Sequence, residues 1–176
     1  MQGSVIKFDR AVAGVIEKLP RGLEPVMSAA TFVGLPVVII ALAAIVAVAA
    51  WVKGQHRIAY AMIASVVALG GNSILKHVVH RTRPDTMYVA NMKIHSYSFP
   101  SGHAFGAVVI YGLLAYLAYT HLPAPYNLIL STGLVCLIIL IGISRVFLGA
   151  HFPSDVLAGW ALGAACLFLI IKFIKP

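Results

Sequence analysis

The chain has 176 residues, of which 61% are hydrophobic and 10% are charged, and its formal net charge is +8. Soluble globular domains carry about 25% charged residues, so this composition excludes an ordinary soluble domain and indicates an integral membrane protein. The cations stand at the ends of apolar runs instead of forming a basic stripe, which argues against a nucleic-acid partner. Membrane lipids with anionic headgroups, or an anionic substrate, explain the positive charge better. Cys136 and Cys166 both fall inside apolar runs, where we expect packing and neither a disulfide nor a metal site.

The N-terminal segment, residues 1–22, predicts an amphipathic helix that lies on the membrane surface. Apolar and charged residues recur over residues 4–19 at a roughly helical period, and Pro20, Arg21 and Gly22 close the segment. The same charges interrupt the apolar core that a cleavable signal peptide would need. We therefore expect the membrane spans themselves to direct insertion.

Five apolar runs follow, and each is long enough to cross a bilayer core of about 30 Å. They cover about residues 25–52, 58–76, 102–120, 126–145 and 153–172. The chain has no obvious repeat, low-complexity tract or linker, so residues 1–176 are predicted to form a single membrane-embedded domain. The predicted fold class is all-α, a polytopic membrane helical bundle of about five transmembrane helices plus the N-terminal interfacial helix. Gly70 and Gly71, in the second run, predict a close approach of another helix.

The unusual polar residues collect at one end of the predicted bundle. Alternating spans place the end of the second, the start of the third, the end of the fourth and the start of the fifth on one side of the membrane. The long polar connection, residues 77–100, lies on that side as well, and connections of this length are usually functional lids or site walls. It contains ionisable residues to which the sequence assigns no role: His77, His80, Asp85 and His95.

Three short motifs at this end each suit a phosphate group. Lys76 and Arg83 are seven residues apart and form a cationic wall. Ser101 and Gly102 begin the third span, where a hydroxyl, free backbone N–H groups and the positive end of the helix dipole favour an anion. Arg145 ends the fourth span and can hold two phosphate oxygens through its planar guanidinium.

Two histidines and a carboxylate complete the set. Phe152 precedes Pro153 and is biased away from helix, which places His151 just before the fifth span and Asp155 in its first turn. A carboxylate that accepts from one ring nitrogen leaves a lone pair on the other, which suits a nucleophile. His103 stands in the first turn of the third span. Each motif alone is typical of a helix start or a membrane anchor, but their joint placement at one end favours a catalytic site.

These residues resemble the tripartite signature of the type 2 phosphatidic acid phosphatase superfamily, in its membrane lipid phosphatase branch. The matching residues run from Lys76 to Asp155: Lys76 with Arg83 and Pro84, then Pro100, Ser101, Gly102 and His103, then Ser144, Arg145, His151 and Asp155. The resemblance implies that His151 forms a phosphohistidine, Asp155 supports it, and His103 is the acid for the leaving oxygen. It further implies that the phosphoryl oxygens are bound, without a metal or other cofactor, by Lys76, Arg83, Ser101, Gly102 and Arg145. Many members have six spans, whereas five are predicted here.

The implied activity is hydrolysis of the phosphomonoester or diphosphate of a membrane lipid. Undecaprenyl diphosphate, phosphatidylglycerophosphate and lipid A phosphates are substrates of compact bacterial relatives, and nothing in this sequence chooses among them. The resemblance also implies the bacterial inner membrane, with the active site on the outer face. Basic residues at the opposite end of the spans agree with a cytoplasmic location of that end: Lys53, Arg57, Lys172 and Lys175. The oligomeric state is left open.

Two other functions would use the same residues. A phosphotransferase would pass the phosphoryl group to another lipid instead of to water. A transporter or scramblase would bind headgroups without chemistry, but binding alone does not need an imidazole supported by a carboxylate, so His103 and His151 disfavour it. A haloperoxidase, from another branch of the superfamily, does not suit so apolar a chain.

Overall fold

The computed structural model describes residues 2–93 and 95–174, and every regular element in this part of the chain is a helix. The elements are α1 (Gln2–Ile16), the 3-10 turn η1 (Arg21–Leu23), α2 (Glu24–Val33), α3 (Pro36–Val52), α4 (His56–Val79), α5 (Met87–Asn91), α6 (Gly102–His121), α7 (Tyr126–Phe147) and α8 (Pro153–Ile174). Within the described residues, α4, α6, α7 and α8 are each long and apolar enough to cross a membrane, and η1, α2 and α3 together form a fifth, bent candidate. The predicted all-α membrane bundle is therefore confirmed.

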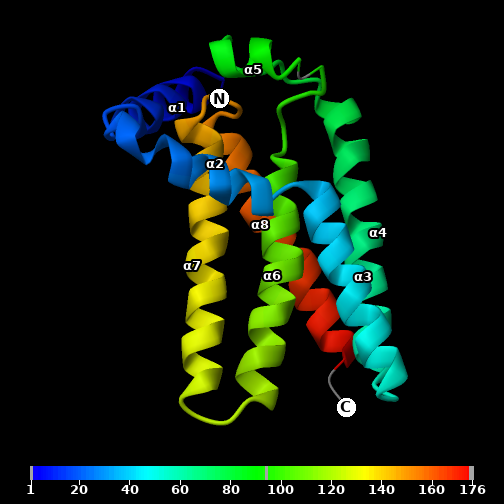
Figure 1. The fold of residues 1–176 in the computed structure, drawn as a ribbon. Coiled ribbons are helices and arrows are strands. Elements are labelled where there is room, and N and C mark those ends of the chain that lie inside the picture. Colours follow the sequence, from blue (N-terminus) through cyan, green and yellow to red (C-terminus); the bar gives the residue numbers. More distant parts are fainter. Residues whose placement is uncertain (1, 94, 175–176) are drawn as a thin grey trace.

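The long helices run side by side, and the short ones gather at one end (Figure 1). α1, α2 and α5 lie at the end where α4 and α7 finish and where α6 and α8 begin. The α3–α4 and α6–α7 turns lie at the opposite end. The polar connections are thus brought together at one end, as the alternation of the spans predicts.

The predicted first span, residues 25–52, is not one straight helix. It divides at Gly34 and Leu35 into α2 and α3, which are bent by 50° relative to each other. Leu35 has extended backbone angles, φ −61° and ψ 138°, because the ring of Pro36 disfavours the helical conformation in the residue before it. The bend turns α2 across the end of the bundle (Figure 1). The other four predicted ranges differ from α4, α6, α7 and α8 by at most three residues at either end.

The helix α6 is central, and glycines let α8 pack directly against its backbone. α6 contacts α3, α4, α7 and α8. A Cβ at Gly159 would lie 2.7 Å from the carbonyl oxygen of Ser101, and a Cβ at Gly163 would lie 2.9 Å from that of Phe105. Such small-residue contacts are common between membrane helices. At the end of this contact the N–H of Ser101 donates to the carbonyl of Asp155 at 3.0 Å, so the helix pairing sets these two residues side by side.

The close approach predicted at Gly70 and Gly71 is wrong. A Cβ at either position would meet no atom of the described chain within 4 Å. Side chains of α4 instead approach glycines of α6: Cδ2 of Leu69 would lie 3.0 Å from a Cβ at Gly106, and Nδ2 of Asn72 would lie 3.5 Å from a Cβ at Gly102. The glycines at close helix contacts therefore lie in α6, α7 and α8, such as Gly142 of α7, where a Cβ would meet the ring of Trp160.

The N-terminal helix α1 packs on α7 and α8 at the polar end of the bundle. Ala13 and Ile16 contact the small apolar cluster that contains Val146 and Val156. Most of α1 is exposed, but Asp9 is only 3% exposed. A buried carboxylate on a surface helix needs partners, and these lie in the site described next.

Candidate active site

Arg83 reaches the imidazole of His151 from the irregular segment between α4 and α5. α4 ends where His80 adopts the left-handed conformation (φ 54°), so the chain leaves the helix before Arg83. Its Nε donates to the carbonyl of Ser96 at 2.8 Å, and its Nη1 donates to the carbonyl of Ala150 at 2.8 Å. Held in this way, Nη1 lies 3.1 Å from Nε2 of His151.

The contact with Arg83 determines which nitrogen of His151 carries the proton. A guanidinium only donates, so Nε2 presents its lone pair and the proton belongs on Nδ1. Nδ1 lies 3.5 Å from Oδ2 of Asp155, a long separation for a hydrogen bond, and it has no hydrogen-bond partner among the described residues. Catalytic hydrogen bonds of this kind are often long in the free enzyme and tighten in the complex.

His151 lies in the connection between α7 and α8 and is 3% exposed. Burial lowers the pKa of its imidazole to about 4, the charges of Arg83 and Arg145 act in the same direction, and Asp155 opposes them. The imidazole is therefore neutral near pH 7, which is the form that a nucleophile needs. Burial, followed by the charge of Arg145, also lowers the pKa of Arg83 from its usual value.

Asp155 is fully buried in the first turn of α8, and three donors fix its orientation. Oδ1 accepts from Nη1 of Arg81 at 2.6 Å. Oδ2 accepts from the N–H of Phe152 at 2.9 Å and from the hydroxyl of Ser98. These bonds leave Oδ2 facing Nδ1 of His151, so the carboxylate is placed to stabilise the imidazole when it becomes positively charged.

Lys76 lies beside the N-terminus of α6. Its Nζ donates to the carbonyl of Pro100 at 2.8 Å, immediately before the helix begins. Ser101 caps α6, because its Oγ accepts from the N–H of Ala104 at 3.4 Å. A Cβ at Gly102 would lie 4.0 Å from Cε of Lys76. An ammonium group and a helix N-terminus next to each other favour binding of an anion.

Arg145 is buried at the end of α7, and α2 holds it there. Its Nη1 donates to Oγ1 of Thr31 at 2.9 Å, and Oγ1 lies 2.8 Å from the hydroxyl of Ser144. The buried Nε of Arg145 has no partner among the described residues. Part of the guanidinium is thus left for an anion.

His103, in the first turn of α6, completes the set. Its buried Nε2 has no hydrogen-bond partner in the described part of the chain, so this nitrogen is available to a substrate. Lys76, Arg83, Arg145 and His151 all lie close enough to interact electrostatically with it. Its Cδ2 would lie 3.2 Å from a Cβ at Gly34, so the absence of a side chain at Gly34 makes room for the ring.

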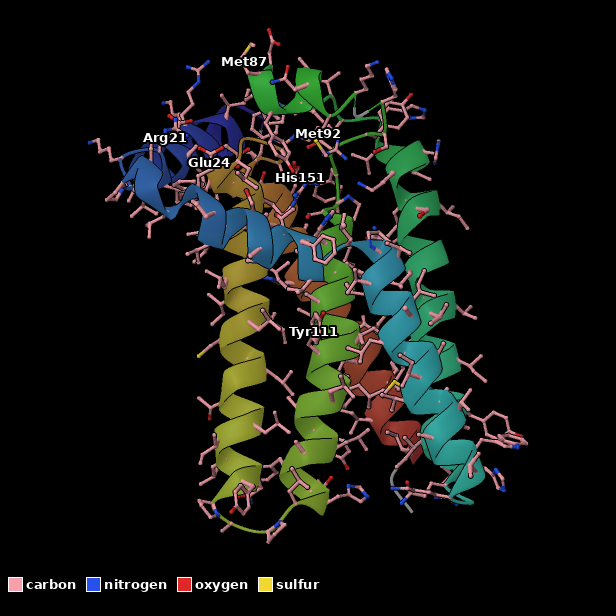
Figure 2. The ribbon with its side chains drawn as sticks, viewed as in Figure 1. Arg21, Glu24, Met87, Met92, Tyr111 and His151 are labelled. Carbon is pink, nitrogen blue, oxygen red and sulfur yellow. The ribbon has the colours of Figure 1, made fainter. Side chains whose placement is uncertain are left out.

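The structure therefore brings all eight predicted site residues to one end of the bundle. They come from α4, the α4–α5 segment, the N-cap and first turn of α6, the end of α7, the α7–α8 connection and the start of α8: Lys76, Arg83, Ser101, Gly102, His103, Arg145, His151 and Asp155. Figure 2 shows His151 near this end, below the segment marked by Met87 and Met92 in that view. A cavity of about 550 Å³ lies next to it, between α1 and the two polar connections, and His151 contributes to its lining.

Sequence reasoning missed several residues that hold the site together. They are Asp9, Thr31, Arg81, Ser98 and Ser154. Arg81 could have been noticed as a second arginine two residues before Arg83. Nothing in the pattern of the N-terminal helix separates Asp9 from Glu17, since both are acids on an amphipathic segment. Which acid is buried depends on how α1 docks.

Comparisons with known proteins agree with this arrangement. Phosphatidylglycerophosphatase B of Bacillus subtilis (strain 168) is 38% identical over 104 residues, which are 58% of this chain and 50% of that protein. Undecaprenyl-diphosphatase of Sulfolobus acidocaldarius is 31% identical over 140 residues, which are 68% of this chain and 57% of that protein. The chain thus spans about half the length of these curated relatives.

A solved structure shares the fold over nearly the whole chain. It is the crystal structure of a transmembrane PAP2-type phosphatidylglycerolphosphate phosphatase from Bacillus subtilis, with a TM-score of 0.83 and 29% identity, and the match covers 97% of this chain and 86% of that chain. Together with the apolar helices, this likeness shows an integral membrane protein. The model of the PAP2 superfamily matches residues 55–176, which include every one of the eight site residues, and the chain therefore belongs to the PAP2 superfamily.

Proposed function

We propose that the protein hydrolyses a phosphomonoester or diphosphate of a membrane lipid through a phosphohistidine formed on His151. The observation that carries the proposal is the geometry of that imidazole. Nε2 presents a lone pair toward the guanidinium of Arg83 at 3.1 Å, while Nδ1 faces Asp155. A nucleophile, the group that orients it and a phosphate-binding cation thus occupy one site.

The reaction follows from these positions in two steps. In the first, the lone pair on Nε2 of His151 attacks phosphorus, the phosphorus–oxygen bond to the lipid breaks, and His103 gives its proton to the departing oxygen. In the second, a water oxygen attacks phosphorus, His103 takes a proton from that water, and the nitrogen–phosphorus bond breaks to release phosphate. Lys76, Arg83 and Arg145, with the N-terminus of α6, stabilise the negative charge on the phosphoryl oxygens throughout.

The location of the site and the relatives of the chain support a lipid substrate. The site lies at the end of helices that are apolar enough to cross a membrane, so a lipid phosphate would reach it from the headgroup layer. The relatives named phosphatidylglycerophosphatase B and undecaprenyl-diphosphatase give two substrate candidates. We further propose the bacterial inner membrane, with the site on its outer face.

Phosphate release from purified lipids tests the proposal directly. The protein in detergent would be given phosphatidylglycerophosphate, undecaprenyl diphosphate and a lipid A phosphate, and we expect one or more of them to release inorganic phosphate. Because cations of the chain supply the positive charge, EDTA should leave the rate unchanged. Transfer of labelled phosphate to another lipid without release would indicate a phosphotransferase instead.

Two histidine variants provide the matched comparison. His151→Ala should lose all release, whereas His121→Ala, an exposed histidine at the far end of α6, should keep the wild-type rate. Release by His151→Ala, or loss of activity with EDTA and recovery with magnesium, would contradict the proposal.

A further inference from the structure

The guanidinium of Arg81 joins two carboxylates that lie 146 positions apart in the chain, Asp9 and Asp155. Nη2 donates to Oδ2 of Asp9 at 2.6 Å, and Nη1 donates to Oδ1 of Asp155 at 2.6 Å. The guanidinium also stacks on the ring of Phe152, with its carbon 4.4 Å from the ring centroid. Contacts in two directions and over a ring face hold the side chain in one orientation.

The backbone of Arg81 supports Asp155 a second time. Its carbonyl accepts from the N–H of Ser98 at 2.8 Å, and the hydroxyl of Ser98 donates to Oδ2 of Asp155. The positions of both carboxylate oxygens of Asp155 therefore depend on where Arg81 lies. The Arg81 side chain contacts Asp9, Phe152, Ser154 and Asp155. At Nε2 of His151, where the phosphate would bind, the guanidinium within reach is that of Arg83.

Asp9 anchors the other side of this arginine and joins α1 to the start of α8. Oδ1 accepts from the N–H of Ser154 at 2.8 Å, and Oδ2 accepts from the hydroxyl of Ser154 at 2.9 Å. The hydroxyl in turn accepts from Nη1 of Arg81 at 2.7 Å. The side chain of Asp9 is 4% exposed, against 24% for that of Arg81, so these charges interact with little screening by water.

The charges of the three groups determine what the arrangement does electrostatically. One guanidinium shared by two carboxylates leaves a net charge of −1 on the cluster Asp9–Arg81–Asp155. A neutral pair of Arg81 with Asp155 would stabilise a positive imidazole less than this negatively charged cluster does. When Nε2 bonds to phosphorus, His151 becomes cationic, so the negative cluster favours the phosphoenzyme.

We infer that Asp9 and Arg81 are positioning residues of the reaction, and that α1 is through them a working part of the active site. Arg81 holds Asp155 with Oδ2 toward Nδ1 of His151, and Asp9 holds Arg81 and keeps the cluster negative. The inference rests on the proposed attack by His151. It goes beyond the site residues derived from the sequence, because neither residue belongs to the eight.

Measurement of phosphoenzyme formation with a lipid phosphate, in detergent, tests the inference. Arg81→Gln should lower the rate about 100-fold, the scale of a misplaced reacting group, with KM unchanged because Arg81 does not hold the phosphate. Arg81→Lys should recover part of the rate, since it restores the charge without the planar fork. Asp9→Asn should lower the rate about tenfold or more, because the cluster loses its negative charge and one of the two acceptor oxygens that hold Arg81 and Ser154 becomes a donor.

Matched variants separate positioning from simple docking of α1. Glu17→Gln makes the same chemical change at an exposed acid next to α1 and should keep the wild-type rate. Ser154→Ala removes the hydroxyl contacts to Asp9 and Arg81 but leaves both ion pairs of Arg81, so it should lower the rate clearly less than Asp9→Asn does. If Ser154→Ala lost as much as Asp9→Asn, or if Glu17→Gln did, the inference would be wrong. A raised KM with unchanged turnover in Arg81→Gln would show a substrate-binding role and overturn it too.

A readout without turnover distinguishes this inference from the proposed function. Nitrogen-15 NMR of labelled histidine reports the Nδ1 proton of His151, which should shift in Asp9→Asn and Arg81→Lys and stay unchanged in Glu17→Gln. If the wild type released no lipid phosphate, the proposed function would fail while the spectral difference still reported the coupling. If no variant moved the signal, the coupling would be refuted whatever the activity. Asp9→Asn and Arg81→Lys therefore carry the test even if Arg81→Gln does not fold.

Discussion

The imidazole of His151 is buried beside one carboxylate and two guanidinium groups, and this environment decides its protonation. Burial lowers its pKa to about 4 from an ordinary value of 6.5. Below pH 6.5 the unfolded chain therefore binds a proton at this position that the folded chain does not bind until about pH 4. The contribution of His151 to the free energy of unfolding falls as the pH decreases through this window and is constant above it.

A pH series on the folded protein checks this first prediction. Carbon-13 NMR of labelled histidine should show His151 titrating near pH 4, and the melting temperature of His151→Gln should depend less on pH between 6.5 and 4 than that of the wild type. A titration of His151 near 6.5, or equal pH dependence of the two proteins, would show that the imidazole is not held neutral by burial.

The roles of the two histidines can be separated by the leaving group. If His103 protonates the departing oxygen, the need for it should shrink with a nitrophenyl phosphate, whose leaving group is a weak base, because a general acid contributes about 10²–10⁴-fold only where a proton must be delivered. His103→Ala should recover much of phosphoenzyme formation on the aryl phosphate relative to a lipid phosphate. His151→Ala should stay inactive on both.

Quenching each variant with labelled substrate and counting acid-labile phosphate on the protein provides the measurement. The phosphoenzyme should also accumulate in His103→Ala, because this variant lacks the imidazole that would activate the water for hydrolysis of the phosphoenzyme. Two results would mean that the roles are assigned to the wrong residues. One is labelled phosphate on the His151→Ala protein, and the other is an equal loss of phosphoenzyme formation by His103→Ala on the two substrates.

At the scale of elements, the pairing of α6 with α8 sets the distance between the helix start at Ser101 and the turn that carries Asp155. A Cβ at Gly159 would lie 2.7 Å from the carbonyl of Ser101 and 3.0 Å from Cβ of Ala104. The carbonyl of Ser101 is part of the helix backbone, so it cannot move away from an added Cβ as the end of a flexible side chain could. Gly159→Ala should therefore push the helices apart, destabilise the protein by about 1–3 kcal/mol and reduce activity.

Gly133 of α7 provides the matched control, because a Cβ there would meet no atom of the described chain within 4 Å. Gly133→Ala should be neutral or stabilise the protein by up to about 1 kcal/mol, through the higher helix propensity of alanine. Thermal unfolding of both variants in the same detergent compares them. Equal stability of Gly159→Ala and the wild type would show that α6 and α8 do not depend on this contact.

At the scale of the whole molecule, the site lies at one end of the bundle, and its orientation in the membrane is open to a direct test. The opposite end carries Lys53, Arg57 and Lys172 with no acids near them, as expected on the cytoplasmic side, although the active-site end carries more basic residues in total. Lys175, which also entered the orientation prediction, falls outside the described residues. We expect the end with α5 to face outward.

Cysteine labelling in intact cells measures this orientation. In a background with Cys136 and Cys166 replaced by Ala, Lys93→Cys next to α5 should react with a membrane-impermeant maleimide, and Gln55→Cys in the α3–α4 turn should react only after the cells are opened. The reverse pattern would place the active site in the cytoplasm.

The sequence by itself determined the class of the protein and which candidate site residues gather at one end of the bundle. Apolar runs of about 20 residues separated by short polar segments have the length of membrane helices, in which every backbone polar group is paired. The bundle and four of its helices were therefore predicted to within three residues. Alternation of the spans was enough to bring Lys76, His103, Arg145 and His151 to one end. These are short-range or counting arguments, and they need no knowledge of how helices pack.

Only the tertiary structure decided how those residues are held. The break at Leu35 was missed although Gly34 and Pro36 mark it in the sequence. What the sequence does not show is its consequence, that α2 turns so that Thr31 reaches Arg145. Asp9 resembles any acid on a surface helix until α1 docks and buries it against Arg81. Contacts between positions so far apart depend on the packing of whole helices, which residue type and spacing along the chain do not encode.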